Sequence, residues 1–178
     1  MVETAIARLK RILRDKAAQA PAAMTIDQRR QTMESIAFKV ANDITVETLT
    51  VAQRDAEWLR APGIRDDRAV LYLHGGGYVM GSPNTHRSLA GEISRAAQAA
   101  VLLIDYRLAP EYPFPAAVED GVAAWRWLLD QGFAPARTAI AGDSAGDGLT
   151  VATLPSARDQ ELPMPAAAVS MSPWSDLT

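Results

Sequence analysis

The chain has 178 residues, of which 48% are hydrophobic and 22% are charged, and its formal net charge is −3 at pH 7. This length fits one domain with a buried core, and the weakly acidic balance gives no polybasic surface for nucleic acid or an anionic membrane. No apolar run is long enough to span a bilayer, and the chain opens on an amphipathic segment, not on a signal peptide. With no cysteine there is no disulfide framework and no thiolate site. We therefore expect a soluble, cytoplasmic protein without nucleic-acid or membrane partners.

The first forty residues predict two helices. The apolar positions at helical spacing in the first are Ile6, Leu9, Ile12 and Leu13. Thr25 and Gln28 fit a capping box that begins the second helix. Both segments are too short and too polar to be stable alone, so we expect them to lie against a larger core, either as surface helices or as a lid over a site.

From Ile44 the pattern changes to that of strands. Residues 44–51 alternate and are rich in branched side chains, and residues 56–60 are a second candidate that ends before Pro62. Nearly continuous apolar runs follow at 69–73, 101–104, 138–141 and 166–171. Such runs are typical of strands buried on both faces of a parallel sheet.

Helical stretches lie between these runs, at about residues 85–98, 116–130 and 145–158. The alternation of strands and helices predicts an α/β fold with a mostly parallel sheet and helices on both faces.

The pentapeptide Gly142-Asp143-Ser144-Ala145-Gly146 stands between one of these strands and one of these helices. A serine hydroxyl needs exposure and an adjacent base to act as a nucleophile. A sharp turn between strand and helix supplies the exposure, the flanking glycines give the backbone room, and the helix amino terminus favours developing negative charge. The pentapeptide alone is common by chance, but this context indicates Ser144 as a candidate nucleophile.

A second motif, His74-Gly75-Gly76-Gly77-Tyr78, directly follows the run 69–73. Consecutive glycines allow backbone N–H groups to converge on an oxyanion, although three glycines alone more often form a flexible turn. Acyl transfer through a tetrahedral intermediate needs a nucleophile and an oxyanion hole side by side. The two motifs, each after a strand, therefore predict that chemistry.

Together with further motifs, these residues carry a resemblance to a known family. The motifs are H-G-G-G-Y at 74–78, D-Y-R-L-A-P-E at 105–111, F-P-A at 114–116, G-D-S-A-G at 142–146 and S-P-W-S-D at 172–176. Over roughly residues 40 to 178 the chain resembles the hormone-sensitive-lipase-like branch of the α/β-hydrolase carboxylesterases.

The resemblance implies an α/β-hydrolase fold and hydrolysis of short- to medium-chain acyl esters, with Ser144 as the nucleophile. It implies oxyanion N–H groups from Gly76, Gly77 and Ala145. His74 and Gly75 would support the glycine loop, and His74 would not act as the base.

The same resemblance implies a domain organisation, with residues 1–40 as cap helices and residues 41–178 as a truncated α/β-hydrolase domain. The enzymes that the chain resembles use no metal or organic cofactor, and their partner is a small-molecule ester.

Triad residues in this fold follow the order serine, acid, histidine. Here the two histidines, His74 and His86, precede Ser144, and Asp176 comes too early to be the acid. We therefore expect a chain truncated before the acid, the histidine and the last strands, and nearly inactive, because loss of triad members costs several powers of ten in rate. The strand at 166–171 would then be an apolar edge that invites homo-oligomers.

The helix after the nucleophile holds two further departures from the family pattern. Asp147 stands where the family usually has glycine, and it places a carboxylate near the oxyanion. Pro155 lies in the expected helix interior, where proline costs ~3 kcal/mol, so we expect a kink or an early helix end near residues 151–154.

Other polar and aromatic residues receive structural interpretations. His86 is expected in the first turn of a helix, Asp143 is expected to point away from the reacting centre, and Asp105, Arg107 and Glu111 are expected to form one charge network. At least one of the two tryptophans at 125 and 127 should pack on the sheet.

Two other functions stay open. The chain could be a non-catalytic small-molecule binder, since plant gibberellin receptors resemble this branch and have lost the histidine. It could also be a partial fold stabilised by self-association.

Overall fold

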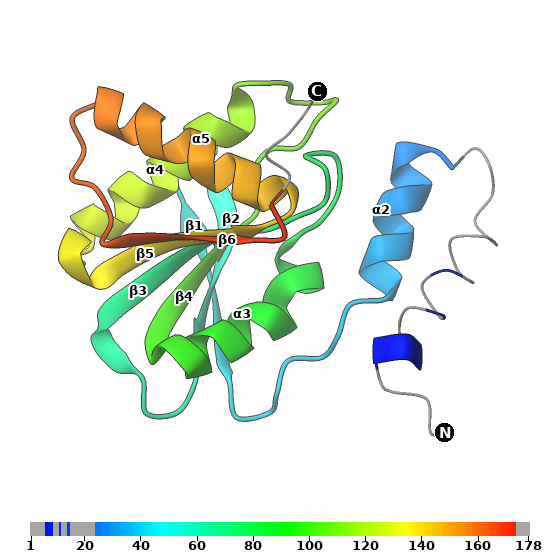
Figure 1. The fold of residues 1–178 in the computed structure, drawn as a ribbon, viewed down its shortest axis with the longest axis horizontal. Helices are drawn as coiled ribbons and strands as arrows, with labels where there is room; N and C mark the ends of the chain where they lie inside the picture. The colour runs from blue at the N-terminus through cyan, green and yellow to red at the C-terminus, as the bar shows by residue number, and fades with distance from the viewer. Residues whose placement is uncertain (1–5, 9–10, 12–13, 15–23, 174–178) are drawn as a thin grey trace.

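A mixed sheet organises the part of the chain that the computed structural model describes, which is residues 6–8, 11, 14 and 24–173. The sheet has six strands in the order β1-β2-β4-β3-β5-β6, with helices on both faces (Figure 1). The strands are β1 Thr45–Val51, β2 Arg54–Arg60, β3 Arg65–Leu73, β4 Ala99–Ile104, β5 Thr138–Asp143 and β6 Ala167–Met171. The helices are α2 Ile26–Ser35, α3 Pro83–Ala97, α4 Ala116–Asp130 and α5 Ala145–Asp159, with a 3₁₀ turn η1 at Pro135–Arg137.

The sheet contains both antiparallel and parallel strand pairs. β1 and β2 form an antiparallel hairpin whose turn residues, Ala52 and Gln53, both have positive φ, which suits the twist of a tight hairpin. β2 also pairs antiparallel with β4, whereas β3–β4, β3–β5 and β5–β6 are parallel. The predicted α/β fold with helices on both faces is confirmed.

Two hydrophobic layers enclose the sheet, and alternate residues of β3 enter one or the other. Leu71 and Leu73 pack in the layer that holds α4 and α5, where Trp125 is fully buried and donates its indole N–H to Pro163 O at 2.9 Å. Val70 and Tyr72 pack in the layer that holds α3. Burial on both faces explains why the central strands read as continuous apolar runs, and Trp125 confirms that a tryptophan packs on the sheet.

The last strand, β6, is not buried on both faces as predicted. Every residue of β4 is buried, but Ala167 to Ser170 of β6 are exposed, so the prediction of burial on both faces was wrong for this strand. The physical reason is its position, because β6 lies at the edge of the described sheet and pairs with β5 alone among the described strands.

Helix α5 passes through Pro155 without interruption, so the predicted kink or early end near residues 151–154 was wrong (Figure 1). Proline cannot donate to the carbonyl of Val151. Both residues are exposed, so water can satisfy that carbonyl, while Leu149 and Ala157 on the other side of the helix are fully buried. This packing holds the helical geometry.

Helix α2 begins at the predicted capping box. Gln28 N donates to Thr25 Oγ1 at 3.2 Å, and Thr25 N donates to Gln28 Oε1 at 2.9 Å. The helix has no buried residue and lies outside the sheet, beside α3 (Figure 1). Leu9, Ile12 and Leu13 of the other predicted helix lie outside the described residues. None of the helices in the described part of the chain is long and apolar enough to cross a membrane.

Candidate functional site

The candidate nucleophile lies on a strained turn between β5 and α5. Ser144 has φ 52° and ψ −117°, a conformation that a non-glycine residue rarely adopts. A Cβ atom on Gly142 would overlap the carbonyl of Gly146, and one on Gly146 would overlap the carbonyl of Leu73. The two glycines of the pentapeptide are therefore required by close backbone packing, and the predicted strand–turn–helix context is confirmed.

Ser144 is half-buried, and its backbone N–H donates to Met171 O at 3.0 Å, which ties the turn to the end of β6. Among the described residues its hydroxyl has no hydrogen-bond partner.

The glycine loop meets this turn because β3 and β5 are parallel neighbours, with Leu73 opposite Gly142. Gly76 and Gly77 have φ of 127° and 65°, which favour glycine, and a Cβ on Gly76 would overlap the carbonyl of Met80. The N–H groups of Val79 and Met80 both donate to Gly76 O, at 3.2 and 3.1 Å. The loop is thus a closed turn that lies, like Ser144, at the carboxyl ends of the parallel strands β3 and β5.

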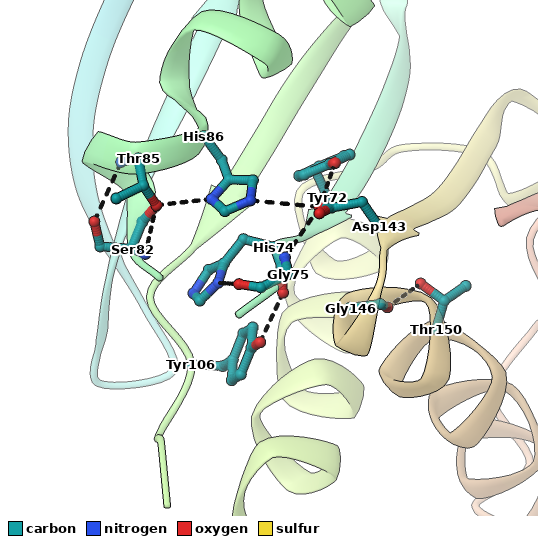
Figure 2. Close-up of polar contacts among 10 residues, drawn as sticks. All are labelled: Tyr72, His74, Gly75, Ser82, Thr85, His86, Tyr106, Asp143, Gly146 and Thr150. Carbon is teal, nitrogen blue, oxygen red and sulfur yellow. Dashed lines mark hydrogen bonds and ion pairs between the residues drawn. The ribbon is translucent and has the colours of Figure 1, made fainter. Parts of the chain in front are cut away.

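Asp143 joins the loop to the nucleophile turn (Figure 2). Its Oδ1 accepts hydrogen bonds from Tyr72 Oη at 2.7 Å and from Gly75 N at 3.0 Å, and it lies 3.5 Å from His86 Nε2. Burial opposes its ionisation, but the contacts with His86 and Tyr72 outweigh burial, so the pKa of Asp143 lies below its ordinary value. Burial, and then the bond to Asp143, raise the pKa of Tyr72. A carboxylate and a neutral phenol therefore face each other here.

His74 contacts the glycine loop from within the core. Its ring is fully buried and stacks on Tyr106 at 4.2 Å between centroids, and its Nδ1 lies 2.8 Å from Gly75 O (Figure 2). Burial lowers the pKa of His74 to about 4, so the ring is neutral near pH 7 and Nδ1–H donates to that carbonyl. Its Nε2 is buried and has no partner among the described residues.

His86 lies in the first turn of α3, as predicted. Its Nδ1 is 2.8 Å from Thr85 Oγ1, and its Nε2 faces Asp143. The contact with Asp143 was not foreseen, and neither was Tyr72, since both depend on which strands and helices become neighbours. Both histidines of the chain are therefore engaged around Asp143 and the loop, and neither is bonded to Ser144 within the described residues.

Asp147 lies in the first turn of α5 and is fully buried. Its Oδ1 contacts the hydroxyl of Ser170 on β6, whereas Oδ2 has no partner in the part of the chain that the structure describes.

An apolar pocket of about 480 Å³ opens beside the glycine loop. Its wall includes Tyr78 of the loop, Phe114 before α4, Val118 of α4, and Gly148 and Val151 of α5. Among the described residues, no group of three or more His, Cys, Asp or Glu side chains is placed to hold a metal ion.

The predicted network of Asp105, Arg107 and Glu111 is not present. Arg107 pairs with Asp120 and Glu119 of α4, and Glu111 pairs with a residue of α2. Burial, followed by the charge of the nearby Asp55, raises the pKa of Asp105 to about 6. The partners come from helices remote in sequence, which a local motif does not reveal.

The fold and this turn are of the α/β-hydrolase type, and comparisons agree. Residues 70–178 match the family model for the α/β-hydrolase fold. The chain is 56% identical over 131 residues to an acetyl-hydrolase of Streptomyces hygroscopicus, a match that covers 74% of this chain and 44% of that protein. It is 38% identical over 168 residues to an ethyl acetate hydrolase of Pseudomonas putida, covering 84% and 52%.

Solved structures give the same result. An esterase/lipase from an uncultured bacterium matches with a TM-score of 0.93 and 65% identity, over 96% of this chain and 58% of that one. An esterase of the bacterial hormone-sensitive lipase family matches with a TM-score of 0.92 and 49% identity, over 99% and 60%. The chain belongs to the α/β-hydrolase family, in its hormone-sensitive-lipase-like carboxylesterase branch. It spans about half the length of the curated relatives named above.

Proposed function

We propose that this protein is a serine carboxylesterase that acts on short- to medium-chain acyl esters. The observation that carries the proposal is the strained conformation of Ser144, which sets its side chain on a sharp turn directly beside the glycine loop. Such a turn presents a hydroxyl for attack on an ester carbonyl.

In the proposed reaction Ser144 Oγ forms a bond to the acyl carbon and gives up its proton to a base. The negative charge on the carbonyl oxygen is met by the N–H groups of Gly76, Gly77 and Ala145, which donate to no other described residue. The C–O bond to the alcohol then breaks, and the alcohol leaves with the proton. Water hydrolyses the acyl-enzyme by the same route and releases the acid.

The apolar pocket supports the proposed substrate class. About 480 Å³ with apolar walls from Phe114, Val118 and Val151 suits an aliphatic acyl chain of modest length, and Arg107 is the one charged residue among the described residues of the lining. Two relatives are named for acetyl and ethyl acetate substrates, which also points to short acyl groups.

We further propose that the 178-residue polypeptide turns over slowly by itself. Its histidines are His74, which is buried against Tyr106, and His86, which faces Asp143, so Ser144 has no described imidazole to take its proton. Oxyanion and binding effects alone leave a rate several powers of ten below that of a full triad.

Two measurements test these statements separately. For the polypeptide itself, we expect hydrolysis of p-nitrophenyl butyrate to stay close to that of the Ser144→Ala variant. Ser144-dependent turnover as fast as that of a full-length relative would overturn the slow-turnover proposal. To test the esterase function, residues 1–173 of this chain are fused to a carboxyl-terminal segment of the esterase from the uncultured bacterium. That segment is the part that follows the region matched by this chain. A folded fusion should hydrolyse acetate and butyrate esters, and inactivity equal to its Ser144→Ala form would overturn the assignment.

A binding function is the second candidate, because the pocket is formed and both histidines are engaged elsewhere. It predicts that butyrate or its esters bind to the polypeptide and are recovered unchanged. Calorimetry together with product analysis separates this outcome from hydrolysis.

A further inference from the structure

Helix α2 is attached to the rest of the molecule by charged side chains. None of its ten residues is fully buried, and its apolar residues Ile26 and Met33 are only half-buried, so hydrophobic burial is small. A helix of this length is not stable alone in water. Charged contacts with the body therefore contribute much to its position, and they come from Arg30 and Glu34, which are one helical turn apart.

Arg30 uses its guanidinium to contact two loops at once. Its Nε donates to Val79 O at 2.7 Å, and its Nη2 donates to Ala109 O at 3.0 Å. Its two terminal nitrogens also form a forked pair with Glu111, at 2.8 and 2.7 Å. Hydrogen bonds from a charged donor are stronger than neutral ones, and the planar fork fixes their directions.

Val79 belongs to the closed turn of the glycine loop. Its N–H is used within the turn, donating to Gly76 O, and its carbonyl accepts from Arg30. The preceding carbonyl, that of Tyr78, accepts from Ala109 N at 2.8 Å. Arg30 thus bridges two segments that are already joined by a backbone hydrogen bond, and it closes the outer side of the turn.

Glu34 binds the residues that follow the glycine loop. Its carboxylate accepts from Ser82 Oγ at 2.5 Å and from Asn84 Nδ2 at 2.7 Å, and Ser82 is the N-cap of α3. One face of α2 therefore fastens both the glycine loop and the beginning of α3.

We propose that Arg30 is a positioning residue for the oxyanion loop. By holding the Val79 carbonyl it keeps the turn closed and so fixes the direction of the Gly76 and Gly77 N–H groups. These glycines have wide conformational freedom, and a turn built on them needs restraint from outside. The inference rests on the proposed function only in assigning those N–H groups to an oxyanion; the restraint itself is independent of catalysis.

The test is hydrogen exchange of the whole 178-residue chain, read by mass spectrometry on peptides that cover residues 75–81. Arg30→Ala should speed exchange of these amides about tenfold or more, because a charge-assisted hydrogen bond to the turn is lost. Amides of β3 to β5 should not change. Arg29→Ala is the matched control, since Arg29 is an exposed neighbour on the same helix.

Rescue separates positioning from a general loss of structure. Arg30→Lys keeps the charge but not the fork, and it should restore part of the protection. Equal exchange at residues 75–81 in Arg30→Ala and Arg29→Ala would overturn the proposal, and so would faster exchange spread evenly over the sheet. Because exchange needs no turnover, failure of the esterase assignment leaves this result readable.

Discussion

The hydroxyl of Tyr72 donates a 2.7 Å hydrogen bond to the carboxylate of Asp143 and so links the strand before the glycine loop to the residue before Ser144. The same carboxylate oxygen accepts from the Gly75 backbone, so it holds both halves of the candidate site in one arrangement. A side chain inside the nucleophile motif thus acts on the loop that accompanies it.

Removing that donor should loosen the junction. We expect Tyr72→Phe to lower the free energy of unfolding by about 1–2 kcal/mol, because the aromatic packing stays while a part-buried hydrogen bond to a charged group is lost. Urea unfolding gives the value. Tyr112→Phe, at a half-exposed tyrosine, should change it by less than about 0.5 kcal/mol. An equal effect of the two substitutions would contradict a special role for Tyr72.

Acid should destabilise the protein through His74. Its pKa is about 4 in the folded chain against an ordinary 6.5, so the unfolded chain binds more protons between these values. The contribution of His74 is therefore complete above pH 6.5 and is lost as pH falls toward 4, by up to about 3 kcal/mol. His74→Gln should be less stable near pH 7 but should show a flatter decline over this range in denaturant titrations at several pH values.

Asp105 makes stability change with pH in the opposite direction, so its effect must be distinguished from that of His74. Its folded pKa of about 6 is raised, so its contribution is complete below its ordinary pKa of 3.8 and is lost as pH rises toward 6. The His74 comparison is therefore best made with Asp105→Asn in both proteins. An unchanged slope in His74→Gln on that background would refute the assignment of the acid response to His74.

Asp147 should lower the free energy of unfolding. One of its carboxyl oxygens is buried without a described partner, and such a group costs about 1–3 kcal/mol. Asp147→Ala should therefore raise the free energy of unfolding by a similar amount, and alanine also favours the helix. Ser170, which loses its partner, is exposed and can bind water. Asp159→Ala, at the exposed end of the same helix, is the control, and a less stable Asp147→Ala protein would show that the contact with Ser170 matters more.

Elements defined by local pattern could be predicted from the sequence. Helix α4 has the predicted bounds, Ala116–Asp130, and the capping box at Thr25 and Gln28 forms as expected, because periodicity and capping depend on residues a few positions apart. The two glycine motifs were placed correctly for a similar reason, since each follows an apolar run.

Features that depend on distant neighbours were missed. The pairing of Arg30 with Glu111 joins residues 81 positions apart, and Tyr72 meets Asp143 across 71 positions. Pro155 was misjudged because its helix position faces water, and exposure of a helix face is a tertiary property. The composition of β6 predicted burial on both faces, which its exposure contradicts, whereas its place at the edge of the described sheet was expected.

That edge leads to a prediction about assembly. Among the described strands β6 pairs only with β5, and its Val169 is 46% exposed; a strand edge of this kind is a template for another chain. We expect the polypeptide to self-associate with rising concentration in sedimentation velocity runs. Val169→Lys should weaken the association about tenfold or more, since a charged side chain on an edge strand opposes pairing. Met164→Lys, at a residue 41% exposed outside the strand, should associate as the unmodified chain does. A monomer at every concentration, or equal effects of the two lysines, would show that β6 is not the contact surface.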